Sequence, residues 1–102
     1  MPKAPLLTEE QIVQALAALR GWALEGDRLV KRIVVRDFTE AVGLVQRLVA
    51  PSDEQNHHPD VAIHWNEVTL TLWTHASGGI TERDLRLAHM IDRITEQPDA
   101  TT

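Results

Sequence analysis

The chain has 102 residues, of which 43% are hydrophobic and 25% are charged. This length predicts a single domain over residues 1–102, and the composition is typical of a globular protein rather than a disordered or membrane protein. The formal net charge of −5 disfavours direct binding to nucleic acid, because phosphates are also negative. The sequence contains no cysteine, which excludes disulfides and metal sites built on thiolates.

The N-terminal residues, MPKAPLLTEEQ, contain only two consecutive leucines before the chain becomes acidic. This apolar run is too short for the core of a secretory signal or for a membrane-spanning helix. We therefore expect a cytoplasmic protein that does not associate with membranes.

The first third of the chain predicts a helix followed by a β-hairpin. Thr8 and Gln11 have the spacing of a capping box, apolar residues follow at helical spacing, and Gly21 marks the end of the helix. Residues 22–25 and 28–36 are predicted to be strands, joined by a short turn that contains glycine.

The remaining residues repeat this pattern and add a third helix. A second helix is predicted from Asp37 until Pro51, which marks its end, and a polar loop follows. Residues 61–65 and 68–75 are predicted to be strands of a second hairpin, with a turn at Asn66 and the residue after it. A third helix begins near residue 81, so the element order is αββαββα.

Two hairpins and three one-sided helices predict an α+β fold, a four-stranded antiparallel sheet with three helices on one face. In the last strand, Val68, Leu70 and Leu72 point to the same side, which suits the face covered by helices. The third helix carries apolar residues on more than one side, including Leu87 and Met90. We interpret this wider apolar surface as a subunit contact and expect a homodimer or homotetramer.

Three histidines are predicted to converge at one end of the second hairpin. His57 and His58 precede its first strand, and His75 ends its second strand, which runs antiparallel to the first. Imidazoles titrate near pH ~6.5 and suit general acid/base catalysis, and a carboxylate such as Asp53 can orient one of them. A single loop histidine more often contacts only backbone or solvent, but three convergent ones favour a functional site. A metal site is the weaker alternative, because the sequence has no H-x-H or H-x-x-x-H pair.

Residues 53–59, DEQNHHP, are followed after five residues by Trp65, after nine more by His75 and after eight more by Asp84. This spacing resembles the signature of the pterin-4a-carbinolamine dehydratases, and LTLWTHASGGITERDLRLA at residues 70–88 is similar to the same family. The resemblance implies dehydration of 4a-hydroxytetrahydropterin to quinonoid dihydropterin, a step in tetrahydrobiopterin recycling. It implies a small-molecule pterin as the binding partner, and neither a metal nor an organic cofactor.

By this resemblance His57, His58 and His75 are the active-site histidines. Among them we assign His57 and His75 to proton transfer and His58 mainly to pterin binding. Asp53 occupies the acidic position of the signature, where the family often has Glu, and is assigned to the catalytic group with them.

Trp65 and Asp84 are predicted to bind substrate, although Trp65 could equally pack on the sheet and Asp84 could equally cap the third helix. The alternative function is a non-catalytic dimerisation or assembly module with the same fold.

Overall fold

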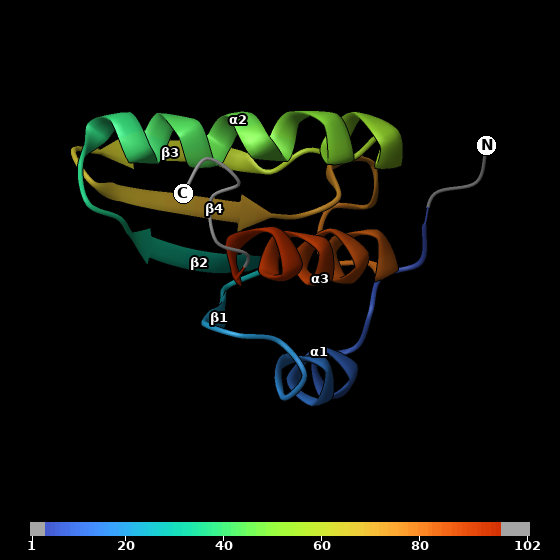
Figure 1. Cartoon of the computed structure of the whole chain (residues 1–102). Helices are drawn as coiled ribbons and strands as arrows, with labels where there is room; N and C mark the ends of the chain where they lie inside the picture. The colour runs from blue at the N-terminus through green and yellow to red at the C-terminus, as the bar shows by residue number, and fades with distance from the viewer. Residues whose placement is uncertain (1–3, 97–102) are drawn as a thin grey trace.

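The computed structural model describes residues 4–96 and has the predicted element order (Figure 1). Its elements are α1 (Glu9–Leu16), β1 (Trp22–Glu25), β2 (Arg28–Val34), α2 (Phe38–Gln55), β3 (Asp60–His64), β4 (Glu67–Leu72), the short 3-10 helix η1 (His75–Ser77) and α3 (Glu82–Glu96). Within these residues no helix is long and apolar enough to cross a membrane.

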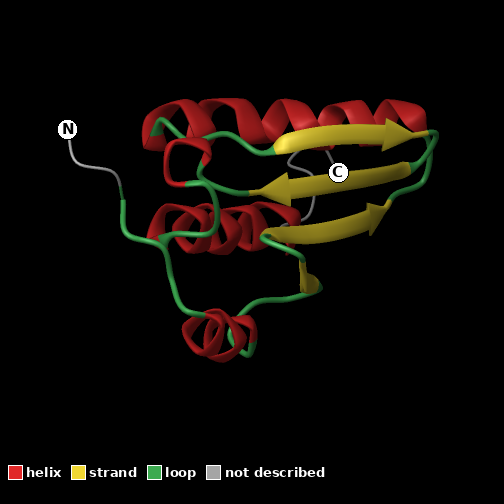
Figure 2. Ribbon diagram, turned by 180° about the vertical axis from the view of Figure 1, so that it is seen from behind, coloured by secondary structure: helices red, strands yellow, loops and turns green. Residues whose placement is uncertain are grey.

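The four strands form one antiparallel sheet in the order β1-β2-β4-β3. Figure 2 shows the sheet in front of α2 and α3, with α1 beside the β1 edge. The predicted α+β fold is therefore confirmed. The core lies between the sheet and the helices, and Val68, Leu70 and Leu72 of β4 are all 0% exposed, as their alternation predicts.

The first helix begins as predicted and ends earlier. Thr8 and Gln11 form the capping box, since each side chain binds the other residue's backbone N–H. Regular α-helix stops at Leu16 rather than continuing toward Gly21. Ala17 and the two residues after it donate backbone hydrogen bonds to carbonyls three positions earlier, so the last turn is tightened into 3-10 geometry.

The prediction that Pro51 ends the second helix is wrong. Helix α2 continues to Gln55, although a proline inside a helix removes one backbone hydrogen bond. Beyond the proline, Ser52 is buried on the same side of the helix as Leu48, one turn earlier, so packing supports the last turn. Asn56 then closes the helix in the left-handed conformation, with φ of 50°.

The strand ends of the two hairpins differ from the predictions by one to three residues. Strand β2 ends at Val34, β3 runs from Asp60 to His64, and β4 ends at Leu72. The second turn lies one residue earlier than predicted and contains Trp65, whose φ is 55°. Two hydrogen bonds between Val35 and Asn66 join this turn to the residue after β2.

The apolar breadth of α3 serves the interior of this chain and gives no support to a subunit contact. Leu87 is 0% exposed and Met90 is 8% exposed. Figure 1 shows α3 between α2 and α1 and against the sheet, so neighbours surround it on several sides. The predicted use of these two residues in subunit packing is therefore corrected, and the homodimer or homotetramer stays a prediction.

Candidate active site

The structure brings His57, His58 and His75 together around one hollow of about 330 Å³. The first two follow α2 and precede β3, and His75 begins η1 just after β4. The antiparallel pairing of β3 with β4 places these two ends of the hairpin side by side, which is the convergence expected from the sequence. The hollow is completed by neighbouring residues of the same segments and by Arg83 of α3.

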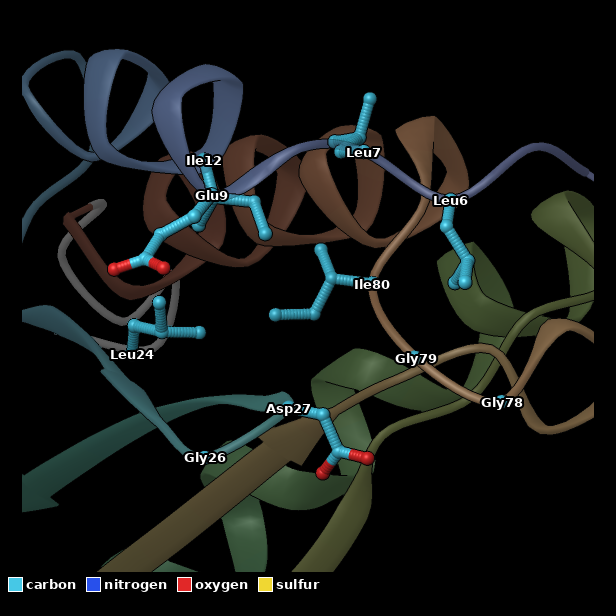
Figure 3. Close-up of a pocket in the computed structure, with 10 residues that line it drawn as sticks. All are labelled: Leu6, Leu7, Glu9, Ile12, Leu24, Gly26, Asp27, Gly78, Gly79 and Ile80. Atoms are coloured by element: carbon cyan, nitrogen blue, oxygen red, sulfur yellow. The ribbon is translucent and has the colours of Figure 1, made fainter.

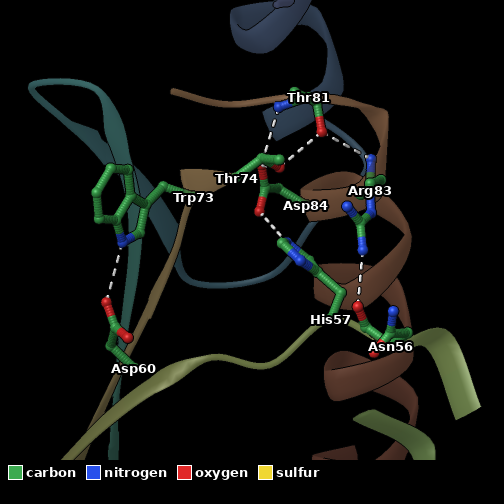
Figure 4. A network of polar contacts seen from close by, with 8 residues as sticks. All are labelled: Asn56, His57, Asp60, Trp73, Thr74, Thr81, Arg83 and Asp84. Atoms are coloured by element: carbon green, nitrogen blue, oxygen red, sulfur yellow. Dashed lines mark hydrogen bonds and ion pairs between the residues drawn. The ribbon is translucent and has the colours of Figure 1, made fainter. Parts of the chain in front are cut away.

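His57 is held by a buried carboxylate (Figure 4). Its Nε2 lies 2.6 Å from Oδ1 of Asp84, and Asp84 is 0% exposed. The other carboxylate oxygen, Oδ2, accepts hydrogen bonds from the Thr74 hydroxyl and from the backbone N–H of Thr81, both at 2.8 Å. Across residues 4–96 no buried side-chain nitrogen or oxygen lacks a hydrogen-bond partner. The network is therefore fully satisfied, as a buried carboxylate requires.

The hydrogen bonds in this network have a consistent direction. The backbone N–H of Arg83 donates to the Thr81 hydroxyl, and the hydroxyls of Thr81 and Thr74 are 2.8 Å apart. Thr74 uses its only proton toward Asp84, so Thr81 donates to Thr74. Since a carboxylate only accepts, His57 donates from Nε2, and its Nδ1 is the nitrogen left for proton exchange.

His58 contacts the second carboxylate of the site at the surface. Its Nε2 lies 2.8 Å from Oδ1 of Asp53, and the two side chains are 56% and 66% exposed. Asp53 belongs to the last turn of α2, not to a loop as predicted, because the helix continues past Pro51. This exposed pair orients His58 but is screened by water, unlike the buried pair at His57.

His75 and Arg83 line the rest of the hollow. The His75 ring lies against the indole of Trp73, with the ring centroids 3.8 Å apart. Arg83 donates from Nη2 to the backbone oxygen of Asn56 at 2.7 Å, which connects the start of α3 to the end of α2. Among residues 4–96 no three His, Asp or Glu residues form a group that could hold a metal ion. The arrangement is suited to proton transfer by imidazoles.

A second, larger hollow of about 440 Å³ lies between α1, the turn of the first hairpin and the loop before α3 (Figure 3). Its lining includes the apolar side chains of Ile12, Leu24 and Ile80, and its charged groups are the carboxylates of Glu9 and Asp27. No imidazole lines it. Size alone would favour this hollow, but the groups needed for acid/base chemistry lie around the smaller one.

Comparison with known proteins identifies the family. The model of the pterin 4 alpha carbinolamine dehydratase family matches residues 5–94. The chain belongs to this family. A relative from Mycobacteroides abscessus, which bears the provisional name of pterin-4-alpha-carbinolamine dehydratase, is 45% identical over 87 residues, covering 85% of this chain and 93% of that protein.

Two solved structures have the same fold as this pterin carbinolamine dehydratase family member. A transcriptional coactivator/pterin dehydratase from Brucella melitensis superposes with a TM-score of 0.80 at 32% identity, over 86% of this chain and 96% of that one. A pterin dehydratase-like protein described as a RuBisCO assembly factor of the alpha-carboxysome gives a TM-score of 0.63 at 22% identity, over 78% and 94% of the two chains. The second likeness shows the fold alone.

Two residues of the dehydratase signature are not placed where direct substrate contact requires. Asp84 is predicted to bind substrate, but it is fully buried with both oxygens occupied, and it contacts His57 rather than the hollow. Trp65 is 66% exposed at the opposite end of the hairpin from the three histidines. The strand β3 separates them, and five residues of strand at about 3.3 Å each span roughly 16 Å. The structure therefore does not bring Trp65 to the hollow.

The sequence predictions for this site omit Thr74 and Thr81, whose hydrogen bonds support the buried pair of His57 and Asp84. A signal for Thr74 was present in the strand alternation, because it continues the inward-facing series of Val68, Leu70 and Leu72. A hydroxyl at an inward position requires a buried partner. Asp84, at the start of the predicted third helix, is that partner.

Proposed function

We propose that this chain is a hydro-lyase that converts 4a-hydroxytetrahydropterin to quinonoid dihydropterin and water in tetrahydrobiopterin recycling. The observation that carries the proposal is the buried His57–Asp84 pair at the wall of a hollow that His58 and His75 also line. Membership of the dehydratase family supports the same reaction.

The reaction needs one acid and one base. The bond between C4a and the hydroxyl oxygen breaks, and a proton from the acid converts the leaving hydroxyl to water. The proton on N5 passes to the base, and the electron pair of the N5–H bond forms the double bond between N5 and C4a. One proton is given and one is taken, so two imidazoles in opposite protonation states balance the reaction without a further reactant.

We assign the proton transfers to His57 and His75 and pterin binding mainly to His58. His57 is supported for this role by its fixed orientation, since Asp84 engages Nε2 and leaves Nδ1 for the substrate. His58 is exposed at the rim and oriented by Asp53, which suits a group that contacts the edge of a flat heterocycle. Asp53 and Asp84 are then positioning residues.

A stopped-flow assay on freshly generated 4a-hydroxytetrahydropterin tests the proposal, because this compound also dehydrates without an enzyme. The protein should accelerate its disappearance above the spontaneous rate. Replacing His57 or His75 by Ala should each remove about 10²–10⁴-fold of kcat, the usual contribution of one positioned acid or base. A wild-type protein with no acceleration would rule out the dehydratase function.

The alternative is a non-catalytic assembly module. It is suggested by the names of the two solved relatives, one a transcriptional coactivator/pterin dehydratase and the other a pterin dehydratase-like assembly factor. The buried pair argues against it for this chain, because removing a carboxylate and an imidazole from water is costly and a docking surface gains nothing from it. Saturable pterin binding that is weakened by His58→Ala would favour the enzyme, and no binding by either protein would favour the module.

A further inference from the structure

His75 is oriented by ring stacking, in contrast to the other two histidines of the hollow. His57 and His58 each contact a carboxylate, whereas the His75 ring makes no hydrogen bond within residues 4–96. Its ring centroid lies 3.8 Å from that of Trp73, with 35° between the planes. Both nitrogens of this imidazole are therefore uncommitted while the ring itself rests on an aromatic surface.

Trp73 is itself fixed by two charged side chains from neighbouring strands. The guanidinium carbon of Arg28 lies 3.4 Å from the centroid of the Trp73 ring, which is a cation–π contact. The indole N–H donates to Oδ2 of Asp60 at 3.0 Å (Figure 4). One contact restrains the ring face and the other restrains its rotation, so the indole has a defined position beside the hollow.

The register of the sheet explains why these residues meet. The last pair of β2 and β4 is Leu29 with Leu72, so Arg28 and Trp73 stand opposite each other one step beyond it. Asp60 pairs with the residue two positions before Trp73, so its side chain lies on the same face as the indole. The support of His75 is thus built on strands, whereas His75 itself begins a three-residue 3-10 helix outside the sheet.

We infer that Trp73 is a positioning residue for His75 in the dehydration, and that Arg28 and Asp60 keep Trp73 in place. This inference rests on the proposed function. An imidazole that transfers a proton needs a ring nitrogen held toward the substrate, and stacking fixes the orientation of the ring without occupying either nitrogen. Trp73 does not itself line the hollow, so its removal should disturb the position of His75 rather than a substrate contact.

The test compares turnover by Trp73→Ala, Trp73→Phe and the control Arg32→Gln. Arg32 lies on the same face of β2 as Arg28 but pairs with Glu25, so this variant removes an exposed arginine without touching the stack. Trp73→Ala should lower kcat on the order of 10²-fold with KM nearly unchanged, as expected for a misplaced reacting group. Trp73→Phe should recover most of kcat because a phenyl ring can stack on the imidazole. The control should retain wild-type kcat.

A structural readout accompanies the kinetics. In proton NMR spectra, the carbon-bound ring protons of His75 should show a ring-current shift in the wild-type protein that disappears in Trp73→Ala and persists in part in Trp73→Phe. If Trp73→Ala does not fold, as judged by thermal melting, Trp73→Phe and Arg28→Gln carry the comparison, with kcat falling further in Arg28→Gln than in Arg32→Gln.

Two results would overturn the inference while leaving the proposed function intact. In the first, the wild-type protein is active and His75→Ala lowers kcat, but Trp73→Ala keeps full kcat. If Trp73→Ala does not fold, full kcat in Arg28→Gln has the same meaning. The other is an equal loss of kcat in Trp73→Phe and Trp73→Ala, which would mean that stacking is not the property required. A wild-type protein that does not accelerate dehydration would overturn the proposed function itself, and the catalytic purpose of the stack with it.

Discussion

Asp84 and His57 are 27 positions apart in the chain, yet the carboxylate that accepts the backbone N–H of Thr81 before α3 also holds the His57 imidazole at 2.6 Å. Both side chains are almost completely removed from solvent. Water does not screen this contact, so the pair should determine the orientation and the tautomer of His57 more strongly than any surface contact could.

Asp84→Asn should place the ring proton of His57 on the wrong nitrogen. The Asn oxygen must take the place of Oδ2 to accept from Thr74 and Thr81, which turns the amide NH₂ toward His57. Nε2 would then have to accept, which moves the ring proton to Nδ1. We expect kcat to fall by about 10²–10⁴-fold in the stopped-flow assay. A folded Asp84→Asn protein with wild-type kcat would contradict the role assigned to this carboxylate.

Thr74→Val should destabilise the protein although valine has nearly the same shape as threonine. The change removes the hydrogen bond to Asp84 and the acceptor of the Thr81 hydroxyl, and both groups are buried. We expect a loss of about 1–3 kcal/mol in the free energy of unfolding, measured with urea. Thr71→Val, which changes a β4 residue on the face opposite the buried Leu70 and Leu72, is the control and should stay within about 0.5 kcal/mol of wild type. Equal losses in the two variants would mean that the network adds no stability.

The exposed pair of His58 and Asp53 should matter much less for stability. Asp53→Asn should change the free energy of unfolding by less than about 1 kcal/mol, and the difference should shrink as salt is added. Any kinetic effect should appear in KM, because His58 is assigned to binding. A fall in kcat comparable with that of Asp84→Asn would show that Asp53 belongs to the proton-transfer machinery instead.

Gly78→Ala should impair both stability and turnover. Gly78 ends η1 with φ of +76°, a conformation that costs a residue with a Cβ about 1–2 kcal/mol. Because η1 carries His75, relief of this strain would displace the imidazole. Gly43→Ala is the matched control, since Gly43 lies inside α2 with no atom within 4 Å of an added Cβ. It should raise stability by about 0.5–1 kcal/mol and leave kcat unchanged. Similar effects of both substitutions would exclude strain at position 78.

Local patterns in the sequence were sufficient for the parts of the fold that local physics determines. The capping box of Thr8 and Gln11 involves residues three apart, and the alternation of β4 follows from the strand period. The convergence of the histidines also followed, because an antiparallel hairpin must bring its two outer ends together.

The errors arose where a distant contact outweighed a local preference. Pro51 should end a helix, but burial of the next residue, Ser52, supports a further turn. Trp65 stands in the signature between two histidine positions, yet the length of β3 carries it away from them. The role of Asp84 depends on Thr74 and His57, which reach it from separate segments, and no spacing rule in one sequence specifies that meeting.

Asp84 contacts both the backbone before α3 and the His57 imidazole, so it links the stability of this helix start to the orientation of a site histidine. A stabilising substitution at the start of α3 would ordinarily be sought among residues that improve the cap, but here a change of Asp84 also alters the support of an imidazole. Efforts to make this protein more heat-resistant should therefore leave Asp84 untouched and work on the exposed sides of α1 and of the part of α2 that precedes Asp53, whose carboxylate contacts His58.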